Sequence, residues 1–170
     1  MPRHLIHLIC GSTGAGKTTY ARRLADELGA IRFSIDEWMS ALFWMDAPQP
    51  IDASWSMERV ERCNSQIWET AVALARRNVP SVLDLGFPTR EQRRYFLSLA
   101  AKEGLSTQLH FLDVPADERW RRVNRRNQAG AAASQLPFQV TREMFDFVES
   151  LFETPGEEEL GAGDVVHIAD

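Results

Sequence analysis

Long apolar segments are missing from this sequence. The run at residues 5–10 is too short to cross a membrane, because a spanning helix takes about 20 apolar residues. It leads directly into a glycine-rich stretch, which does not resemble the cleavage site of a signal peptide. We therefore expect a cytoplasmic protein without a membrane partner.

Cysteine is scarce, with two residues in a chain of 170. Cys10 and Cys63 fall on separate predicted elements and lack the spacing of paired metal ligands. This argues against a disulfide-stapled scaffold and against a cysteine-ligated metal site. We expect both thiols to be reduced, as in cytoplasmic proteins.

An excess of basic residues is also missing. The net charge of −5 argues against broad, non-specific nucleic-acid binding, although it stays compatible with a local basic groove. The guanine-reading motif Asn-Lys-x-Asp does not occur, and residues 84–87 miss the switch motif Asp-x-x-Gly because glycine comes one place early. These absences argue against a nucleotide-dependent switch. The apolar share of 44% and the charged share of 25% are those of one globular domain, residues 1–170.

Residues 11–18 match the phosphate-loop pattern G-x-x-x-x-G-K-[ST] at every fixed position. The apolar run before them predicts a buried strand, and the apolar spacing after them predicts a helix that ends at Gly29. In this context the loop amides and the helix dipole bind phosphate, Lys17 reaches the β- and γ-phosphates, and Thr18 ligates Mg²⁺. The sequence therefore predicts binding of a nucleoside triphosphate, with ATP and Mg²⁺ as the expected pair. The expected nucleotide contacts are Gly11, Ser12, Thr13, Gly14, Ala15, Gly16, Lys17, Thr18 and Thr19.

Strand patterns alternate with helix patterns along the whole chain. This alternation predicts a parallel five-stranded sheet covered on both faces, with ligands collecting at the carboxyl ends of the strands. The fold class is therefore three-layer α/β/α. Strands are expected at residues 5–10, 31–35, 80–85, 107–114 and 165–168, and helices at 20–28, 37–44, 57–77, after Thr89, after Pro115 and after Thr141.

Two aspartates stand near strand ends, where they can approach the phosphates. Asp36 follows the second strand, where a carboxylate can accept the proton of an acceptor hydroxyl. The alternative for Asp36 is an N-cap for a helix beginning at Glu37, which is also the fallback base. Asp84 ends an apolar strand, which is the usual position of a carboxylate that holds Mg²⁺ or a water molecule bound to it. The alternative is that Asp84 lines the acceptor site.

Five arginines crowd residues 119–126. On a helix, Arg119, Arg122 and Arg126 share a face, where guanidinium groups can neutralise the charge of a migrating phosphoryl group. The alternative is a solvated basic face. A small-residue stretch follows the run, as in a mobile lid, so we assign Arg122 and Arg126 a functional role.

Later segments carry weaker signals. The helix after Thr141 is expected to bury Met144, Val148, Leu151 and Phe152, and residues 155–163 are expected to be irregular. The aromatic residues before the third predicted helix are read mostly as core, with two of them near an expected acceptor pocket. These aromatic residues are Trp38, Phe43, Trp44 and Trp55.

The phosphate loop, the segment 33–37, the strand end at Asp84 and the arginine run together resemble small P-loop kinases of the AAA-like group. That group is similar to zeta toxins, chloramphenicol phosphotransferases, polynucleotide 5′-hydroxyl kinases and gluconate or nucleotide kinases. The resemblance implies a nucleoside-kinase-like P-loop fold with an arginine-rich lid at about residues 117–140. It also implies that Asp36 is the base and that Arg122 and Arg126 are the lid arginines.

The combined expectation is an ATP- and Mg²⁺-dependent phosphotransferase acting on a hydroxyl of a small molecule. The expected catalytic residues are Lys17, Asp36, Arg122 and Arg126, and the expected metal ligands are Thr18 and Asp84. A polynucleotide 5′-hydroxyl kinase and a non-catalytic ATP-binding module stay as alternatives, with nucleic acid the less favoured partner. Residues 37–57 match no acceptor-binding pattern, so the acceptor is open.

Overall fold

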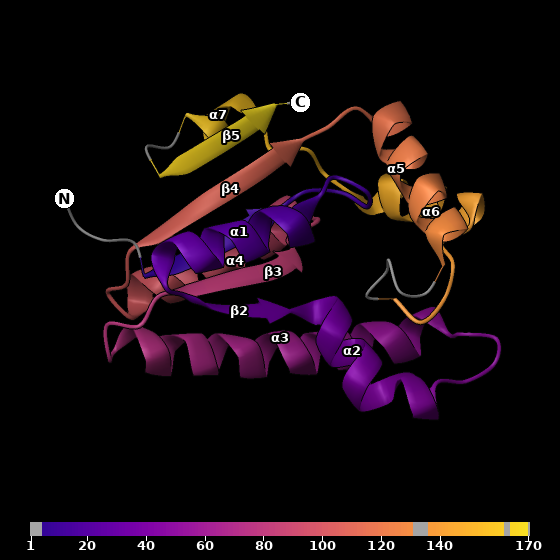
Figure 1. Ribbon diagram of the computed structural model, residues 1–170. Helices are drawn as coiled ribbons and strands as arrows, with labels where there is room; N and C mark the ends of the chain where they lie inside the picture. Colours follow the sequence, from indigo (N-terminus) through magenta and orange to yellow (C-terminus); the bar gives the residue numbers. More distant parts are fainter. Residues whose placement is uncertain (1–4, 131–135, 162–163, 170) are drawn as a thin grey trace.

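The computed structural model describes residues 5–130, 136–161 and 164–169 of the chain. Its five strands form one parallel sheet, as the sequence predicts, and their order is β2-β3-β1-β4-β5 (Figure 1). The residues of β1 are all buried, because the central strand of a sheet covered on both faces meets apolar side chains on each side. The strands are β1 (Ile6–Cys10), β2 (Ile31–Ser34), β3 (Ser81–Gly86), β4 (Thr107–Asp113) and β5 (Val165–Ala169).

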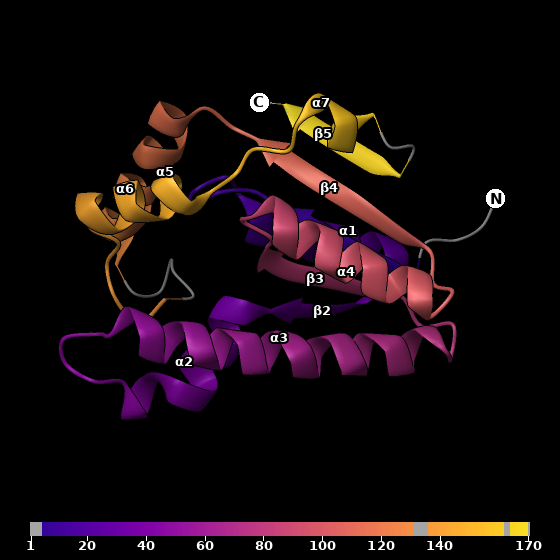
Figure 2. The same cartoon turned by 180° about the vertical axis from the view of Figure 1, so that it is seen from behind.

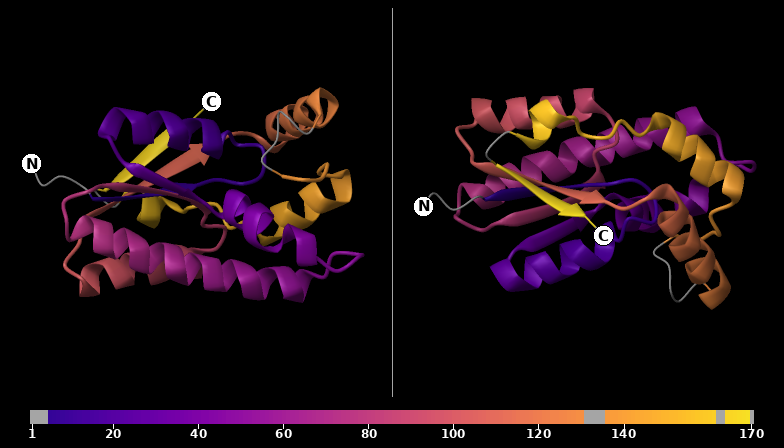
Figure 3. Two further views of the ribbon diagram at one scale, coloured as in Figure 1. Left: turned by 60° about the horizontal axis from the view of Figure 1, so that its bottom comes forward. Right: turned by 90° about the horizontal axis from the view of Figure 1, so that it is seen from above.

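Helices cover both faces of this sheet and gather at its carboxyl end. Figures 2 and 3 show α1 on one face, α3, α4 and α7 on the other, and α2, α5 and α6 beyond the strand ends. The helices are α1 (Lys17–Leu28), α2 (Ile35–Phe43), α3 (Ala53–Ala75), α4 (Arg90–Lys102), α5 (Ala116–Ala129), α6 (Arg142–Leu151) and α7 (Glu157–Leu160), with a short 3-10 turn, η1 (Trp44–Asp46), after α2. No helix in the described part of the chain is both long enough and apolar enough to span a membrane.

The hydrophobic core has one part on each face of the sheet. Ile9, Val82 and Leu112 pack against α1 on one face, while strand residues such as Leu8 and Leu83 pack against α3 and α4 on the other. The middle of α3 is buried at Cys63, Ile67 and Ala71, and Ile67 and Ala71 belong to the same core cluster as Leu8 and Leu83. The core therefore fixes the sheet and leaves its carboxyl end free to carry a site.

Helix boundaries differ from the predictions where caps were not recognised. The third helix begins at Ala53, four residues before the predicted start, because the Asp52 side chain accepts a hydrogen bond from the Trp55 N–H at 2.7 Å. Thr89 and Thr141 cap α4 and α6 as predicted. The small-residue stretch after Ala129 falls mainly on residues 131–134, which lie outside the described residues.

The prediction for the core face of α6 was wrong. Phe145 is buried, with 2% of its surface exposed, whereas Met144, Val148 and Leu151 are 41%, 36% and 49% exposed. Phe152 is partly buried against the main core, in agreement with the prediction. Hydrophobic periodicity identifies residues that share a helix face, but it does not say which face meets the core when a helix carries two apolar faces.

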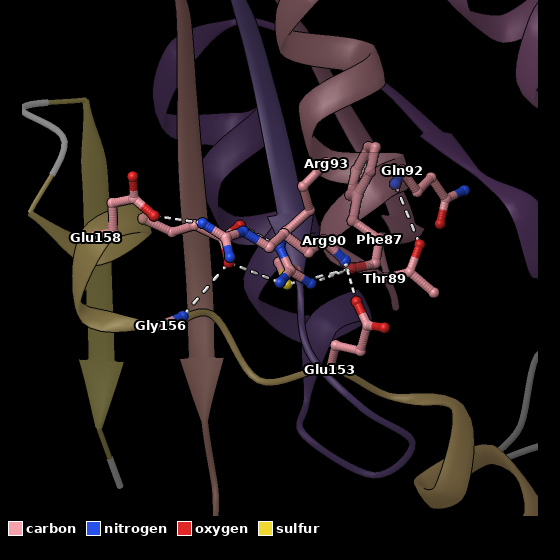
Figure 4. Close-up of polar contacts among 10 residues, drawn as sticks. Phe87, Thr89, Arg90, Gln92, Arg93, Glu153, Gly156 and Glu158 are labelled. Atoms are coloured by element: carbon pink, nitrogen blue, oxygen red, sulfur yellow. Dashed lines mark hydrogen bonds and ion pairs between the residues drawn. The ribbon is translucent and has the colours of Figure 1, made fainter.

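Residues 155–161 are more ordered than the irregular segment that we expected. They contain the short helix α7, whose Glu159 accepts two hydrogen bonds from the buried guanidinium of Arg93, at 2.8 and 3.0 Å. Arg93 also donates to the Phe87 carbonyl oxygen, and the Arg90 N–H donates to the Glu153 carboxylate at 2.7 Å (Figure 4). These contacts attach the segment after α6 to the start of α4.

Candidate active site

The phosphate loop joins β1 to α1, and its backbone requires glycine at two positions. Gly14 and Gly16 have φ angles of 81° and 87°, in the left-handed region that other residues rarely adopt. A Cβ atom at Gly14 would also lie 2.5 Å from the carbonyl oxygen of Arg119. The loop thus curls at the amino end of α1, where free N–H groups and the helix dipole favour an anion.

Lys17 is the first residue of α1 and lies over the loop. Its ammonium group donates a hydrogen bond to the carbonyl oxygen of Ser12 at 3.0 Å. Burial lowers the pKa of Lys17, while the negative charges of Asp84 and Asp36 act in the opposite direction. A phosphate group beside the ammonium would supply a further negative charge and stabilise the protonated form.

Thr18 and Asp84 meet below the loop, although 66 residues separate them in the chain. The Thr18 hydroxyl donates to a carboxylate oxygen of Asp84 at 3.0 Å, and Arg32 approaches the same oxygen at 3.4 Å. Burial raises the pKa of Asp84, although the charge of Lys17 and the hydrogen bond from Thr18 oppose the shift. The Asp84 carboxylate is buried beside the phosphate loop, and Asp84 does not line the open cleft above that loop.

This pair of oxygens fits Mg²⁺. Hydroxyl and carboxylate oxygens are the hard ligands that this ion takes, and it usually completes its shell with waters and substrate phosphates. Among the described residues, no three His, Cys, Asp or Glu side chains gather to form a metal site by themselves. A metal site made of Thr18, Asp84 and a bound triphosphate needs no such cluster. The contact between Thr18 and Asp84 favours a role for Asp84 in binding the metal over a role in binding the acceptor.

Asp36 lies in the first turn of α2 and faces the loop across an open cleft, whose lining includes Asp36, Lys17 and Thr18. The alternative that Asp36 caps this helix was wrong, because α2 begins at Ile35 and the Ser34 side chain is its N-cap. The Asp36 carboxylate takes part in no hydrogen bond or ion pair among the residues that the structure describes. It is therefore available to a ligand in the cleft.

Glu37, the fallback base, has other partners. Its carboxylate accepts hydrogen bonds from Arg32 and Arg22, and Arg32 also contacts Asp84. Burial acts to raise the pKa of Glu37, but the hydrogen bonds from Arg32 and Arg22 outweigh it and hold the pKa below its ordinary value. A carboxylate so engaged is a weak proton acceptor, so the geometry favours Asp36 over Glu37 as a base.

Arg119 is buried and links α5 to the phosphate loop and to α6, so it does not belong to a solvent-exposed arginine face. Its guanidinium donates to both oxygens of Glu149, each at 2.7 Å, and to the carbonyl oxygens of Val114 and Thr13. Glu149, on α6, also accepts a hydrogen bond from the Ser12 hydroxyl at 3.0 Å. The hydrogen bonds from Arg119, opposed by burial, lower the pKa of Glu149. Sequence reasoning missed Glu149, because nothing local links a helix near the end of the chain to the phosphate loop.

The remaining arginines of α5 separate into distinct positions. Arg122 lies beside the loop, with one guanidinium nitrogen 3.7 Å from where a Cβ of Gly16 would be, and it pairs with Glu118. Arg126 lines the cleft, and its buried Nη2 atom has no hydrogen-bond partner among the described residues. Arg121 is exposed and pairs with Glu118 at 3.0 Å. Arg122 and Arg126 thus approach the phosphate position, whereas Arg121 does not.

The cleft has a volume of about 740 Å³ and two kinds of wall. Its floor is the phosphate loop with the start of α1, and Asp36, Arg22 and Arg126 add charged groups. The rest is apolar, from the chain before α3, the segment before α6 and α6 itself. The apolar lining residues are Ile51, Ala53, Leu136, Phe138, Val140, Met144, Phe147 and Val148.

Trp44 and Trp55 are the two tryptophans that we expected near an acceptor pocket, and we expected the rest of the aromatic set in the core. Trp38 packs edge-on against Phe33 in the core. Trp55 lies under the guanidinium of Arg59, 4.1 Å from the ring centre. Trp44 stacks on Phe138 with ring centres 5.6 Å apart, so it supports the cleft from behind.

The matched family model agrees with this geometry. It describes an AAA domain and covers residues 6–151, from the first strand to the end of α6. The chain belongs to the AAA domain family. The matched part of this AAA domain includes the phosphate loop, Asp36, Asp84 and the arginines of α5. A search of the curated proteins found no match to the sequence.

Solved structures similar to this AAA domain include several kinases. An unliganded sugar kinase from Janibacter sp. HTCC2649 is 20% identical with a TM-score of 0.68, covering 98% of this chain and 86% of that one. The APS kinase of Mycobacterium tuberculosis, solved with AMPPNP and APS, is 20% identical with a TM-score of 0.62, covering 99% and 90%. A gluconokinase from Sinorhizobium meliloti 1021 is 15% identical with a TM-score of 0.67, covering 98% and 84%. The AAA domain therefore has the α/β fold of P-loop kinases.

Proposed function

We propose that the protein is a phosphotransferase that moves the γ-phosphate of ATP to a hydroxyl group of a small molecule in the cytoplasm. The observation that carries the proposal is one cleft lined by the phosphate loop, Lys17, the Asp36 carboxylate and Arg126, where neither that carboxylate nor the Arg126 Nη2 atom has a partner among the described residues. A phosphate donor, a proton acceptor and a cation for the developing charge are the parts that phosphoryl transfer requires.

In the proposed mechanism the loop amides and Lys17 hold the β- and γ-phosphates, while Asp36 orients the acceptor hydroxyl. The hydroxyl oxygen forms a bond to the γ-phosphorus as its proton passes to the Asp36 carboxylate. The bond from the γ-phosphorus to the bridging oxygen breaks, and its electron pair leaves on ADP. Arg122 and Arg126 stabilise the charge on the migrating group. Mg²⁺ held by Thr18 and Asp84 would neutralise phosphate charge.

The Lys17→Ala variant is expected to lose the response to ATP. Saturating Mg-ATP at about 100 times Kd should stabilise the wild type by about 2.7 kcal/mol, which raises Tm by about 5 °C or more in a chain of this size. The variant should fold normally and show little shift in the same thermal-shift assay. Lys102→Ala, at the end of α4, is the control. Equal shifts in the wild type and Lys17→Ala would overturn the phosphate-loop assignment.

Arg126→Ala is expected to lower kcat by about 10²–10³-fold and to change ATP affinity little, because Arg126 would act on charge that grows in the transition state. Steady-state kinetics with the acceptor found in a screen of alcohols, sugars, nucleosides and 5′-hydroxyl oligonucleotides measure both quantities. Arg122→Ala should behave similarly, and the exposed Arg121→Ala is the control. Equally small effects of all three variants on kcat would mean that the arginines of α5 form only a solvated basic face.

A further inference from the structure

The apolar face of α6 is open to the cleft rather than buried in the core. Met144, Phe147 and Val148 follow the i, i+3, i+4 spacing of one helix face, and 41%, 57% and 36% of their surfaces are exposed. The adjoining side of the same helix is closed, since Phe145 packs against Trp120 and Val123. The helix thus carries a second apolar face, which the described residues leave partly exposed.

This face continues into residues from two other segments. Phe138 and Val140 line the cleft just before α6, and Ile51 lines it from the chain before α3. Trp44, directly after α2, stacks on Phe138 and so joins the helix that carries Asp36 to this lining. We call Ile51, Phe138, Val140, Met144, Phe147 and Val148 the apolar wall.

The apolar wall extends from the Asp36 side of the cleft to the side of α5 and α6. Asp36 and Ile51 belong to the chain between β2 and α3, whereas the other wall residues follow α5 or lie on α6. The stacking of Phe138 on Trp44 brings the two sides together. Because Asp36 and the apolar wall line the same cleft, a molecule that presents a hydroxyl to Asp36 would place its remaining atoms against the wall.

We infer that the phosphoryl acceptor is an alcohol with an apolar, ring-sized group next to its hydroxyl, packed against the apolar wall. This inference rests on the proposed function, because it names the acceptor of that same transfer. A cleft of about 740 Å³ is the size of a small-molecule site. Outside the phosphate loop and α1, the described residues that line the cleft offer two polar side chains, Asp36 and Arg126, too few to pair the hydroxyls of a polyol.

Binding of a simple probe tests the inference without turnover. Saturation-transfer NMR with Mg-AMPPNP present compares 3-phenyl-1-propanol with glycerol, and transfer to the phenyl protons is expected. Phe147→Ser should lose this signal, while Leu151→Ser, on the same helix but outside the cleft lining, should keep it. Phe147 is exposed, so its variant should fold, and Met144→Ser serves as a second one. Absent transfer to the phenyl protons, or equal signals in Phe147→Ser and Leu151→Ser, would overturn the inference.

Turnover gives the second measurement. With γ-labelled ATP, kcat/KM for 3-phenyl-1-propanol should exceed that for glycerol, and Phe147→Ser should lower the first by about tenfold or more while leaving the second nearly unchanged. Equal losses of kcat/KM for both alcohols would overturn the inference, because they would mean that the apolar wall shields the site without binding the acceptor. Labelling confined to sugars or 5′-hydroxyl oligonucleotides would likewise reject an apolar acceptor while leaving the kinase proposal intact. Phenyl binding without any transfer from ATP would instead reject the kinase proposal and keep an apolar ligand site.

Discussion

Asp36→Asn is expected to bind Mg-ATP as tightly as the wild type and to lose phosphoryl transfer by about 10²–10⁴-fold. A general base contributes a factor of this size to the chemical step and contributes little to holding the nucleotide. The substitution keeps the size of the side chain and removes its charge. Stability should change by less than about 0.5 kcal/mol, because Asp36 is exposed and Ser34, not Asp36, caps α2.

The comparison needs a carboxylate of similar exposure outside the cleft. Asp46, in η1, is exposed and does not line the cleft, so Asp46→Asn should retain full activity. Labelled-phosphate transfer to the acceptor and calorimetric ATP binding give the two readouts. Full transfer in Asp36→Asn would remove this residue from the mechanism. An ATP-dependent conformational change that survives the substitution, with no acceptor labelled, would indicate a switch protein instead.

The sequence was sufficient for the parts of the site that are local or that parallel topology brings together. The phosphate loop is one contiguous motif, so its pattern predicts the strand, the turn and the helix at once. Asp36 and Asp84 could be placed near the loop because the carboxyl ends of neighbouring parallel strands meet at one edge of the sheet. The 3.0 Å contact between Thr18 and Asp84 follows from that topology.

Contacts between residues far apart in the sequence could not be predicted from residue spacing. Periodicity placed Arg119 with Arg122 and Arg126, yet Arg119 is buried, and two of its hydrogen bonds go to Glu149, 30 residues later. The apolar pattern of α6 was visible, but the choice of Phe145 for the core depends on how α6 packs against α5. Which apolar face of a helix is buried depends on tertiary contacts, and a single sequence does not reveal these contacts.

Glu159→Gln is expected to destabilise the fold by about 3 kcal/mol, the cost of leaving a buried charge without its partner. Arg93 is fully buried, and its two hydrogen bonds to Glu159 attach α7 to α4. The amide of glutamine can replace part of the hydrogen bonding but not the negative charge. Urea unfolding at neutral pH measures the change. Glu158→Gln is the matched control, since Glu158 is exposed and pairs with Arg90 at the surface, where an ion pair contributes less than about 1 kcal/mol.

The pH dependence of the same pair gives a second check, and its sign is fixed. The hydrogen bonds from Arg93 lower the pKa of Glu159 below its ordinary value of 4.5, although burial opposes them. A carboxylate with a lowered pKa contributes stability that is fully present above its unfolded pKa and is lost as pH falls through its folded pKa. The difference in unfolding free energy between the wild type and Glu159→Gln should therefore be constant near neutral pH and shrink below about pH 4.5. A difference that does not change with pH would mean that packing of the side chain, rather than its charge, holds α7 against α4.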